Sequence, residues 1–255
     1  MRRSVILAAV AALALSSVAC TGGAVLQAPP EPSSYASALA DPVRTADDRA
    51  RDQARHTAET LAFAQVRPGQ KIADMIIGGG YFTRAFSAAV GPRGRVTAWQ
   101  PTEFIAFQTS YGEALTAVDA LANVDGVRSP IAAPVFPTGL DLVFTAQNYH
   151  DLHLNVMPHD TASRVNAAVF EALKPGGLYV VIDHHAVAGA PRTAADTVHR
   201  IDIERVKREV LAAGFELDGE SSILANPDDP LTASVFDGSI RGRTSQFMLR
   251  FRKPG

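Results

Sequence analysis

Short apolar runs alternate with segments of helical period along most of the chain. From residue 66 onward, the runs predict strands, which fall at residues 71–77, 95–99, 126–131, 141–146, 177–183, 215–221 and 245–252. Apolar residues that recur every three to four positions predict helices between them, at residues 81–90, 102–122, 160–173 and 202–213. Strands that alternate with helices indicate a parallel sheet covered on both faces, and partial alternation in the last run indicates a less buried final strand.

The region before residue 66 has a different pattern, charged and rich in alanine. Asp41-Pro42 is typical of a helix N-cap followed by proline in the first turn, and alanines recur at helical spacing as far as Phe63. Four charged residues fall three to four positions apart on the polar side of this predicted helix: Arg44, Asp48, Asp52 and Arg55. Two interpretations are open, a solvated helix face with weak ion pairs or a helix that caps a ligand pocket.

The first twenty residues have the pattern of a processing signal. Two arginines precede an apolar run at residues 5–15 that is too short to span a bilayer, and Ser17-Val18-Ala19 leads to Cys20, the only cysteine of the chain. This resembles a bacterial lipoprotein signal, with Cys20 lipidated; an ordinary signal peptide with an incidental cysteine is the alternative. We therefore divide the chain into a lipoprotein signal peptide at residues 1–20, a flexible tether at 21–40 and a folded domain at 41–255. Thr21 after the cysteine implies anchoring on the periplasmic side of the envelope, at the outer membrane.

Composition sets broad limits on function. The 255 residues are 47% hydrophobic and 20% charged, which is ordinary for a globular protein with a sizeable core. The formal net charge is −2, and lysines and arginines form no cluster with interleaved aromatic residues. The sequence therefore predicts no nucleic-acid partner and membrane contact only through the lipid anchor.

A glycine turn follows the first predicted strand. Asp74 lies within the strand, and Gly78, Gly79 and Gly80 come directly before a helical pattern that starts at Tyr81. A strand, glycine turn and helix in this order let the backbone approach a nucleotide-like ligand at the helix N-terminus. The alternative is a glycine turn that only packs a helix close to a strand.

This turn and Leu173-Lys174-Pro175-Gly176-Gly177, before the fifth predicted strand, resemble the class I S-adenosyl-L-methionine (SAM)-dependent methyltransferases. The resemblance covers about residues 66–253. It implies an α/β, Rossmann-like, doubly wound seven-stranded sheet, here with an N-terminal helical extension, that uses SAM to methylate a small-molecule acceptor. Among these enzymes the chain looks most like a group of exported predicted methyltransferases, through its G-G-G-Y turn, Tyr149-His150-Asp151 and His199-Arg200-Ile201-Asp202.

The resemblance also implies cofactor-binding residues. Gly78, Gly79, Gly80 and the helix start at Tyr81 would hold the methionine end of SAM, and Asp74 would orient the turn or the SAM amine. Gln100 occupies the position of the family's ribose-binding acid, and Glu103 is the nearest carboxylate that could replace it. Ile76 stands where the family has its first glycine, which implies a reshaped turn or weaker cofactor binding.

All but one of the seven histidines follow the fourth predicted strand. Ligands of open α/β sheets bind beyond the carboxyl ends of the strands, so Tyr149, His150 and Asp183 are expected to face the acceptor as catalytic residues. Three interpretations of the histidines remain open. They act as a general base, they bind a metal, or they are loop residues satisfied by the backbone. The metal set would be His150, His153, Asp183 and His184.

Two further features bear on function. The long loop at residues 224–240 is either a lid over the site or a plain insertion. Export to a compartment where SAM is not expected to be abundant, together with Ile76 and Gln100, favours a second hypothesis: a non-catalytic ligand- or partner-binding envelope lipoprotein on a methyltransferase fold. A metal-using hydrolase is a third. The oligomeric state is left open.

Overall fold

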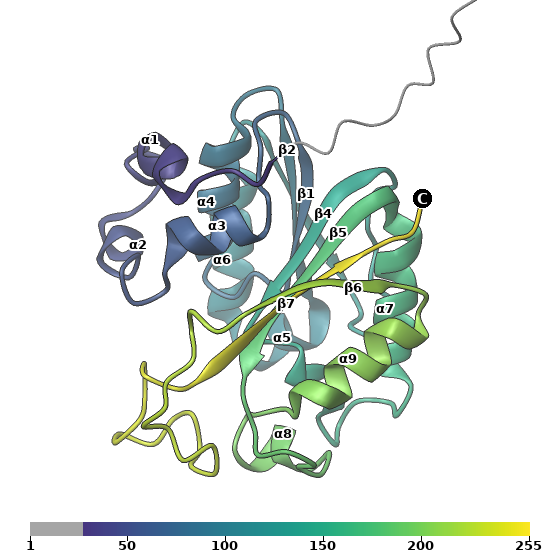
Figure 1. Ribbon diagram of the computed structural model, residues 1–255. Coiled ribbons are helices and arrows are strands. Elements are labelled where there is room, and N and C mark those ends of the chain that lie inside the picture. The colour runs from purple at the N-terminus through teal and green to yellow at the C-terminus, as the bar shows by residue number, and fades with distance from the viewer. Residues whose placement is uncertain (1–27) are drawn as a thin grey trace, which may run out of the picture.

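A computed structural model describes residues 28–255 and has a seven-stranded mixed sheet at its centre (Figure 1). The strands run in the order β3-β2-β1-β4-β5-β7-β6. Parallel pairing links β3, β2, β1, β4 and β5, while β7 is antiparallel to both β5 and β6. Their bounds are β1 Lys71–Met75, β2 Arg95–Pro101, β3 Val124–Ser129, β4 Leu140–Ala146, β5 Leu173–His184, β6 Glu216–Ser221 and β7 Gln246–Arg252.

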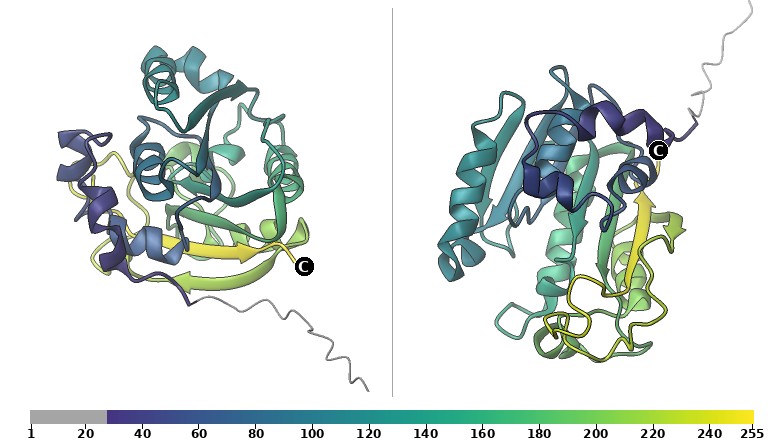
Figure 2. Two further views of the ribbon diagram at one scale, coloured as in Figure 1. Left: turned by 90° about the horizontal axis from the view of Figure 1, so that it is seen from above. Right: turned by 90° about the vertical axis from the view of Figure 1, so that its left-hand side faces the viewer.

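Helices cover both faces of the sheet, as the alternating pattern predicted (Figure 2). On one face, apolar side chains of α3 (Thr57–Phe63), α4 (Tyr81–Val90) and α6 (Thr109–Asp119) pack on the sheet. On the other, α7 (Thr161–Ala172) and α9 (Ile203–Ala212) bury their valines against Val143, Val181 and Leu249. β7 lies between β5 and β6 and is antiparallel to both, so its predicted direction is confirmed. Phe247, Leu249 and Phe251 are buried while Arg250 and Arg252 are half-buried, as the partial alternation predicted.

The N-terminal extension is more ordered than the sequence suggested. A 3-10 turn, η1 (Pro32–Tyr35), and α1 (Ala36–Leu39) lie within the segment predicted to be a tether. Tyr35 is buried, and its hydroxyl donates to the carbonyls of Leu61 at 3.1 Å and Val66 at 2.7 Å. The tether over residues 21–40 is therefore wrong for its last part, because this buried tyrosine fixes the segment to α3.

The single helix predicted from Asp41 to Phe63 is also wrong. Thr45, not Asp41, caps α2 (Ala46–Ala50): it accepts from the Asp48 amide while the Asp48 side chain accepts from the Thr45 amide. The helix then stops, and the chain turns at His56, whose φ is 44°, before α3 begins. A reciprocal cap at Thr45 and a left-handed residue at His56 divide what alanine spacing alone presents as continuous.

Two other elements differ from expectation. The helix predicted at residues 102–122 is two helices, α5 (Thr102–Phe107) and α6, separated by extended backbone at Gln108. Short helices η2 (His150–His153) and α8 (Ala194–Thr197) were not predicted. Among residues 28–255 there is no helix with the length and apolar character that crossing a membrane requires. The predicted signal peptide and Cys20 lie outside the described residues.

Candidate functional site

A cavity of about 680 Å³ lies beyond the carboxyl ends of β1, β2 and β4. Its volume falls in the usual range for small-molecule sites, roughly 300–1,000 Å³. The glycine turn lines one side, and η2 and the end of β5 line the other. The remaining wall comes from three places: the segment that follows α2, the helix α5, and the loop before β7. The cavity therefore joins parts of the chain that are far apart in sequence.

The glycine turn keeps a left-handed path without its first glycine. Ile76 has φ 63°, and Gly78 and Gly80 have φ 53° and 77°. A β-branched residue is rarely found in this region of backbone space, so Ile76 is strained. Its amide donates to the Trp99 carbonyl at 2.9 Å, and its carbonyl accepts from the Asn148 side chain at 3.0 Å. These contacts hold the turn in place.

Gln100, at the end of β2, holds the glycine turn through a hydrogen bond. It is fully buried, and its Oε1 accepts from the Gly78 amide at 3.1 Å. Its Nε2 has no hydrogen-bond partner among residues 28–255, and the residue lines the cavity. Gln100 thus offers a ligand a donor, where the family's acid would offer an acceptor. Glu103 also lines the cavity, and its carboxylate accepts from the Ile131 amide at 3.0 Å.

Asp74 and Tyr81 both line the cavity but differ in their contacts. Asp74 is buried and accepts from the Thr83 hydroxyl at 2.6 Å, and burial raises the pKa of its carboxyl to about 7. The Tyr81 hydroxyl instead donates to Asp52 at 2.5 Å, and burial raises its pKa to about 12. The Tyr81 hydroxyl therefore ties α4 to the N-terminal extension.

The extension brings two arginines to the cavity. Arg51 and Arg55 line it beside the glycine turn, with guanidinium carbons 4.8 and 4.6 Å from the centre of the Tyr81 ring. Burial and the nearby Arg51 charge lower the pKa of Arg55. The interpretation of this segment as a cap on the pocket is therefore supported, and that of a solvated face is wrong. The sequence analysis did not single out Arg51, because local pattern does not distinguish an arginine at a cavity from one on the surface.

Asp183 and His150 form a buried pair at the opposite end. The Asp183 carboxylate accepts from the His150 amide at 2.6 Å and lies 2.9 Å from His150 Nδ1. The His184 amide donates to the same carboxylate at 2.7 Å. Asp183 is fully buried and is not among the residues that line the cavity, whereas His150 is. Asp183 is therefore a positioning residue that holds the imidazole.

Charges around His150 decide which group can accept a proton. Burial disfavours the imidazolium, but the carboxylates of Asp183 and Asp151 outweigh burial and raise the pKa of His150 to about 9. Burial also raises the pKa of Asp151 to about 6. At neutral pH His150 is thus protonated and Asp151 ionised, so the near-neutral base expected at His150 is found instead at Asp151.

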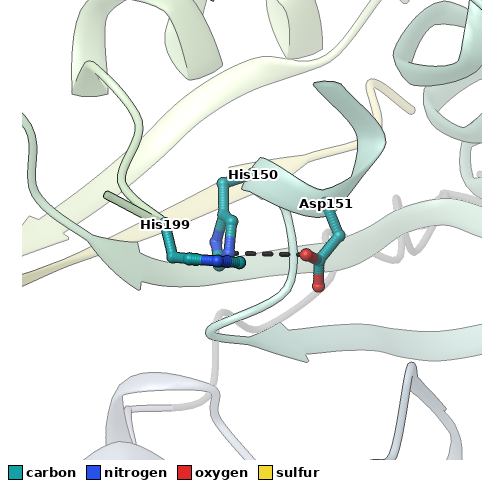
Figure 3. Close-up of side chains that lie close together, drawn as sticks. All are labelled: His150, Asp151 and His199. Carbon is teal, nitrogen blue, oxygen red and sulfur yellow. Dashed lines mark ion pairs between the residues drawn. The ribbon is translucent and has the colours of Figure 1, made fainter. Parts of the chain in front are cut away.

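His199 completes this end of the cavity. Its ring lies edge-on to that of His150, with ring centres 5.5 Å apart, and Figure 3 shows the two rings and the Asp151 carboxylate close together. The sequence placed Asp151 and His199 in notable motifs but gave no sign that they meet. The predicted metal set is not assembled, because His153 pairs with Glu209 at 3.0 Å and His184 with the Thr244 hydroxyl at 2.9 Å.

Tyr149 lies away from the cavity. It is fully buried, and its hydroxyl accepts from Asn166 at 2.8 Å and donates to Glu209 at 3.1 Å. It is not among the cavity-lining residues. The structure therefore does not bring Tyr149 to the cavity, whereas His150 and Asp151 of η2 line it.

The long loop before β7 lines the cavity through Val235 and Phe236. A fully buried ion pair anchors it, with Arg200 donating to both Asp229 oxygens at 2.9 Å. Three large apolar side chains of the cavity wall are strongly exposed, at 86% for Phe107, 82% for Val156 and 60% for Phe236. The loop thus lies over the cavity, as its interpretation as a lid predicted, and the cavity has an apolar mouth.

Known proteins show the same architecture. No protein-family model matches the chain. Over 135 residues it is 32% identical to the ubiquinone/menaquinone biosynthesis C-methyltransferase UbiE of Cupriavidus metallidurans, an alignment covering 50% of this chain and 49% of that protein. A SAM-dependent methyltransferase from Aquifex aeolicus has a similar structure, with TM-score 0.56, 18% identity and coverage of 87% of this chain and 97% of that one. The chain has the fold of the class I SAM-dependent methyltransferases.

This methyltransferase fold confirms the fold class expected from the two motifs. The chain spans about half the length of the curated relative that it matches. The [4+2]-cyclase SpnF also has a similar structure, with TM-score 0.55, 16% identity and coverage of 79% of this chain and 80% of that one. The methyltransferase fold therefore fixes where the cavity lies, and its chemistry depends on the side chains that line it.

Proposed function

We propose that this protein is a SAM-dependent methyltransferase that acts on an apolar small molecule. The observation that carries the proposal is the cavity itself, which joins the glycine turn at one end to a group of titratable side chains at the other. The methyltransferase fold and the sequence similarity to a C-methyltransferase support it. Methyl transfer needs an acceptor aligned with the methyl group, so a site with two chemically distinct ends suits this reaction.

The glycine-turn end is assigned to the cofactor. A side chain at Gly79 would meet no atom within 4 Å of its Cβ, so the turn presents bare backbone to the cavity. Asp74 would pair with the amine of SAM, and Arg55 with its carboxylate. The free Nε2 of Gln100 would donate to an oxygen of the ligand. When bound, SAM supplies the activated methyl group.

The opposite end is assigned to the acceptor. His150, Asp151 and His199 provide its polar contacts, and Asp151 is the group whose pKa suits accepting a proton at neutral pH. Phe107, Val156 and Phe236 at the mouth would contact an apolar body, because exposed apolar groups gain most from an apolar ligand.

Calorimetric titration of the full chain with SAM and S-adenosylhomocysteine tests the proposal. We expect binding at roughly 100 µM or tighter, about −5.5 kcal/mol. Gly79→Arg should abolish this binding. Gly79 does not have a positive φ, and the space around its Cβ position is open, so the arginine side chain enters the cavity without straining the backbone. Gly238→Arg is the matched control, since Gly238 is equally open and does not line the cavity. No heat at millimolar ligand from the folded protein would contradict the proposal.

A second candidate is a non-catalytic ligand- or partner-binding protein on the same fold. Ile76 and Gln100 depart from the family's cofactor pattern, and the predicted export signal favours the same view. SpnF, named as a cyclase, has a similar structure, which is consistent with this fold serving other purposes. Failure to bind SAM together with binding of another nucleoside or an apolar ligand, lost in Gly79→Arg, would favour this candidate.

A further inference from the structure

Three side chains at the acceptor end of the cavity form a cluster with metal-ligand chemistry. His150, Asp151 and His199 each offer one ligand atom, and these atoms all lie within 4.8 Å of one another. All three line the cavity, and Figure 3 shows the two imidazole rings next to each other with the Asp151 carboxylate facing the His150 ring. We propose that these three residues bind a divalent transition-metal ion at the acceptor end of the site.

The two nitrogen donors and one oxygen donor indicate the class of ion. Imidazole favours first-row transition metals, whereas Mg²⁺ and Ca²⁺ prefer sites built from oxygen alone. A metal with ligands at about 2.1 Å needs its donor atoms roughly 3 to 3.5 Å apart. His150 Nε2 and Asp151 Oδ1 are already 3.4 Å apart. The half-buried His199 ring has to move closer.

The surroundings of His150 match those of a metal-bound histidine. Its Nδ1 is engaged by Asp183 at 2.9 Å, which leaves Nε2 directed toward Asp151. A carboxylate on the far nitrogen fixes the orientation of the ring and makes the near nitrogen a better ligand. Asp183 is itself held by the backbone amides of His150 and His184, so the ligand is positioned before any ion arrives.

The local charge also favours a cation. Asp151 and Asp183 place two carboxylates within contact of His150. Arg200, which donates to the His185 carbonyl, is fully buried and paired with Asp229. An ion that binds here displaces the proton from His150 Nε2, and the two carboxylates then offset the charge of the ion.

The backbone holds His199 in an uncommon conformation. Its φ is 53°, in the left-handed region, and its ring packs edge-on against Phe236 at 4.8 Å between centres. Strained backbone of this kind concentrates at functional sites. The turn directs the imidazole into the cavity toward His150, from which it is separated by almost fifty residues of chain.

Three protein ligands leave the remaining coordination positions open toward the cavity. With an ion bound, Asp151 would be a ligand in place of a proton acceptor, and the metal would hold the acceptor through an oxygen or nitrogen atom. This consequence rests on the proposed methyl transfer. The metal site itself does not depend on SAM, because none of its ligands belongs to the glycine-turn end.

The test is metal binding by the full chain after chelator treatment, without SAM. Zn²⁺ is titrated by calorimetry, and Co²⁺ by its visible absorption, which reports the ligand field directly. We expect one ion per chain, bound at micromolar concentration or tighter. Asp151→Asn and His199→Gln should each weaken binding about 100-fold or more. Neither change removes a large buried apolar group, and thermal unfolding verifies that both variants fold.

His185→Gln is the matched control. His185 directly follows β5 and does not line the cavity, so its loss should leave metal affinity unchanged. The proposal would be overturned by binding of less than one ion per chain. It would also be overturned if the Asp151→Asn and His199→Gln variants bound the metal as tightly as the unmodified chain. Because SAM titration is a separate measurement, failure of the metal site and failure of the methyltransferase proposal are distinguishable.

Discussion

At the residue scale, burial changes what the same side chain can do. Asp74 and Asp48 are both buried aspartates, yet burial raises the pKa of Asp74 to about 7, while the Arg84 guanidinium and the Thr45 backbone outweigh burial and hold the pKa of Asp48 at about 2. Burial disfavours the charged form of both carboxyls. The neutral Thr83 hydroxyl offsets this cost for Asp74 less than the charged Arg84 guanidinium offsets it for Asp48. Asp74 is thus ready to gain a cationic partner, and Asp48 already has one.

Asp74 should make SAM binding pH-dependent. Its free carboxyl is protonated below about pH 7, so binding a cationic amine must first remove a proton there. Affinity should therefore rise with pH, by up to about tenfold per unit, and level off above pH 7. Calorimetry between about pH 5.5 and 8 measures this. Asp74→Asn should bind more weakly and lose the slope; an unchanged slope in that variant would show that another group is responsible.

Tyr149 should prove structural. Tyr149→Phe removes the hydroxyl between Asn166 and Glu209 and leaves the buried Asn166 amide without a partner. We expect the free energy of unfolding to fall by about 1–2 kcal/mol. SAM affinity and any methyl transfer should stay unchanged, because the hydroxyl lies outside the cavity. Chemical denaturation and SAM titration measure the two effects, and lost transfer with unchanged stability would restore Tyr149 as a catalytic candidate.

At the element scale, the N-terminal extension is part of the site. Its buried ion pairs fasten it to α4: Asp48 accepts from Arg84 at 2.6 and 2.7 Å, and Asp52 binds Arg44 and the Tyr81 hydroxyl. Arg51 and Arg55 follow from the turn between α2 and α3. A segment that alanine spacing presents as one surface helix is instead two short helices, and Asp48 of the first is buried against Arg84 of α4.

Asp48 should contribute stability that depends on pH. Asp48→Asn leaves Arg84 without its charged partner and should lower the free energy of unfolding by about 2 kcal/mol at neutral pH. Because the folded pKa of Asp48, about 2, lies below its ordinary value of 3.8, this contribution is complete above pH 4 and is lost as the pH falls toward 2. Urea denaturation at several pH values tests it. Asp47→Asn, one residue away and exposed, is the control and should change stability little.

At the scale of the whole molecule, segments far apart in the sequence line one cavity. The glycine turn and the start of α5 come from the first half of the sheet, η2 and the end of β5 from the second. The extension closes one side, and the loop before β7, anchored by Arg200 and Asp229, closes the other. The sheet order brings these ends together, and the side chains then decide what binds.

The full chain should be a membrane-anchored lipoprotein. Cys20 follows three small residues and an apolar run, so we expect the expressed protein to incorporate labelled palmitate and to sediment with bacterial membranes. Cys20→Ser should abolish both and release the protein to the soluble fraction, provided that export continues. Labelling and fractionation measure this directly. Membrane association that persists without label in the Cys20→Ser variant would point to a different anchor.

Local pattern by itself determined the order and type of the main elements, because strand and helix periods are short-range properties. Asp74, the three glycines and the Lys174-Pro175-Gly176-Gly177 motif were also sufficient to indicate the methyltransferase fold. Only the tertiary structure decided that Tyr149 faces the core, that Arg55 reaches the cavity and that His199 meets His150 and Asp151. These outcomes depend on contacts between segments far apart in the chain and on the burial that shifts each pKa, and neither is encoded in local spacing.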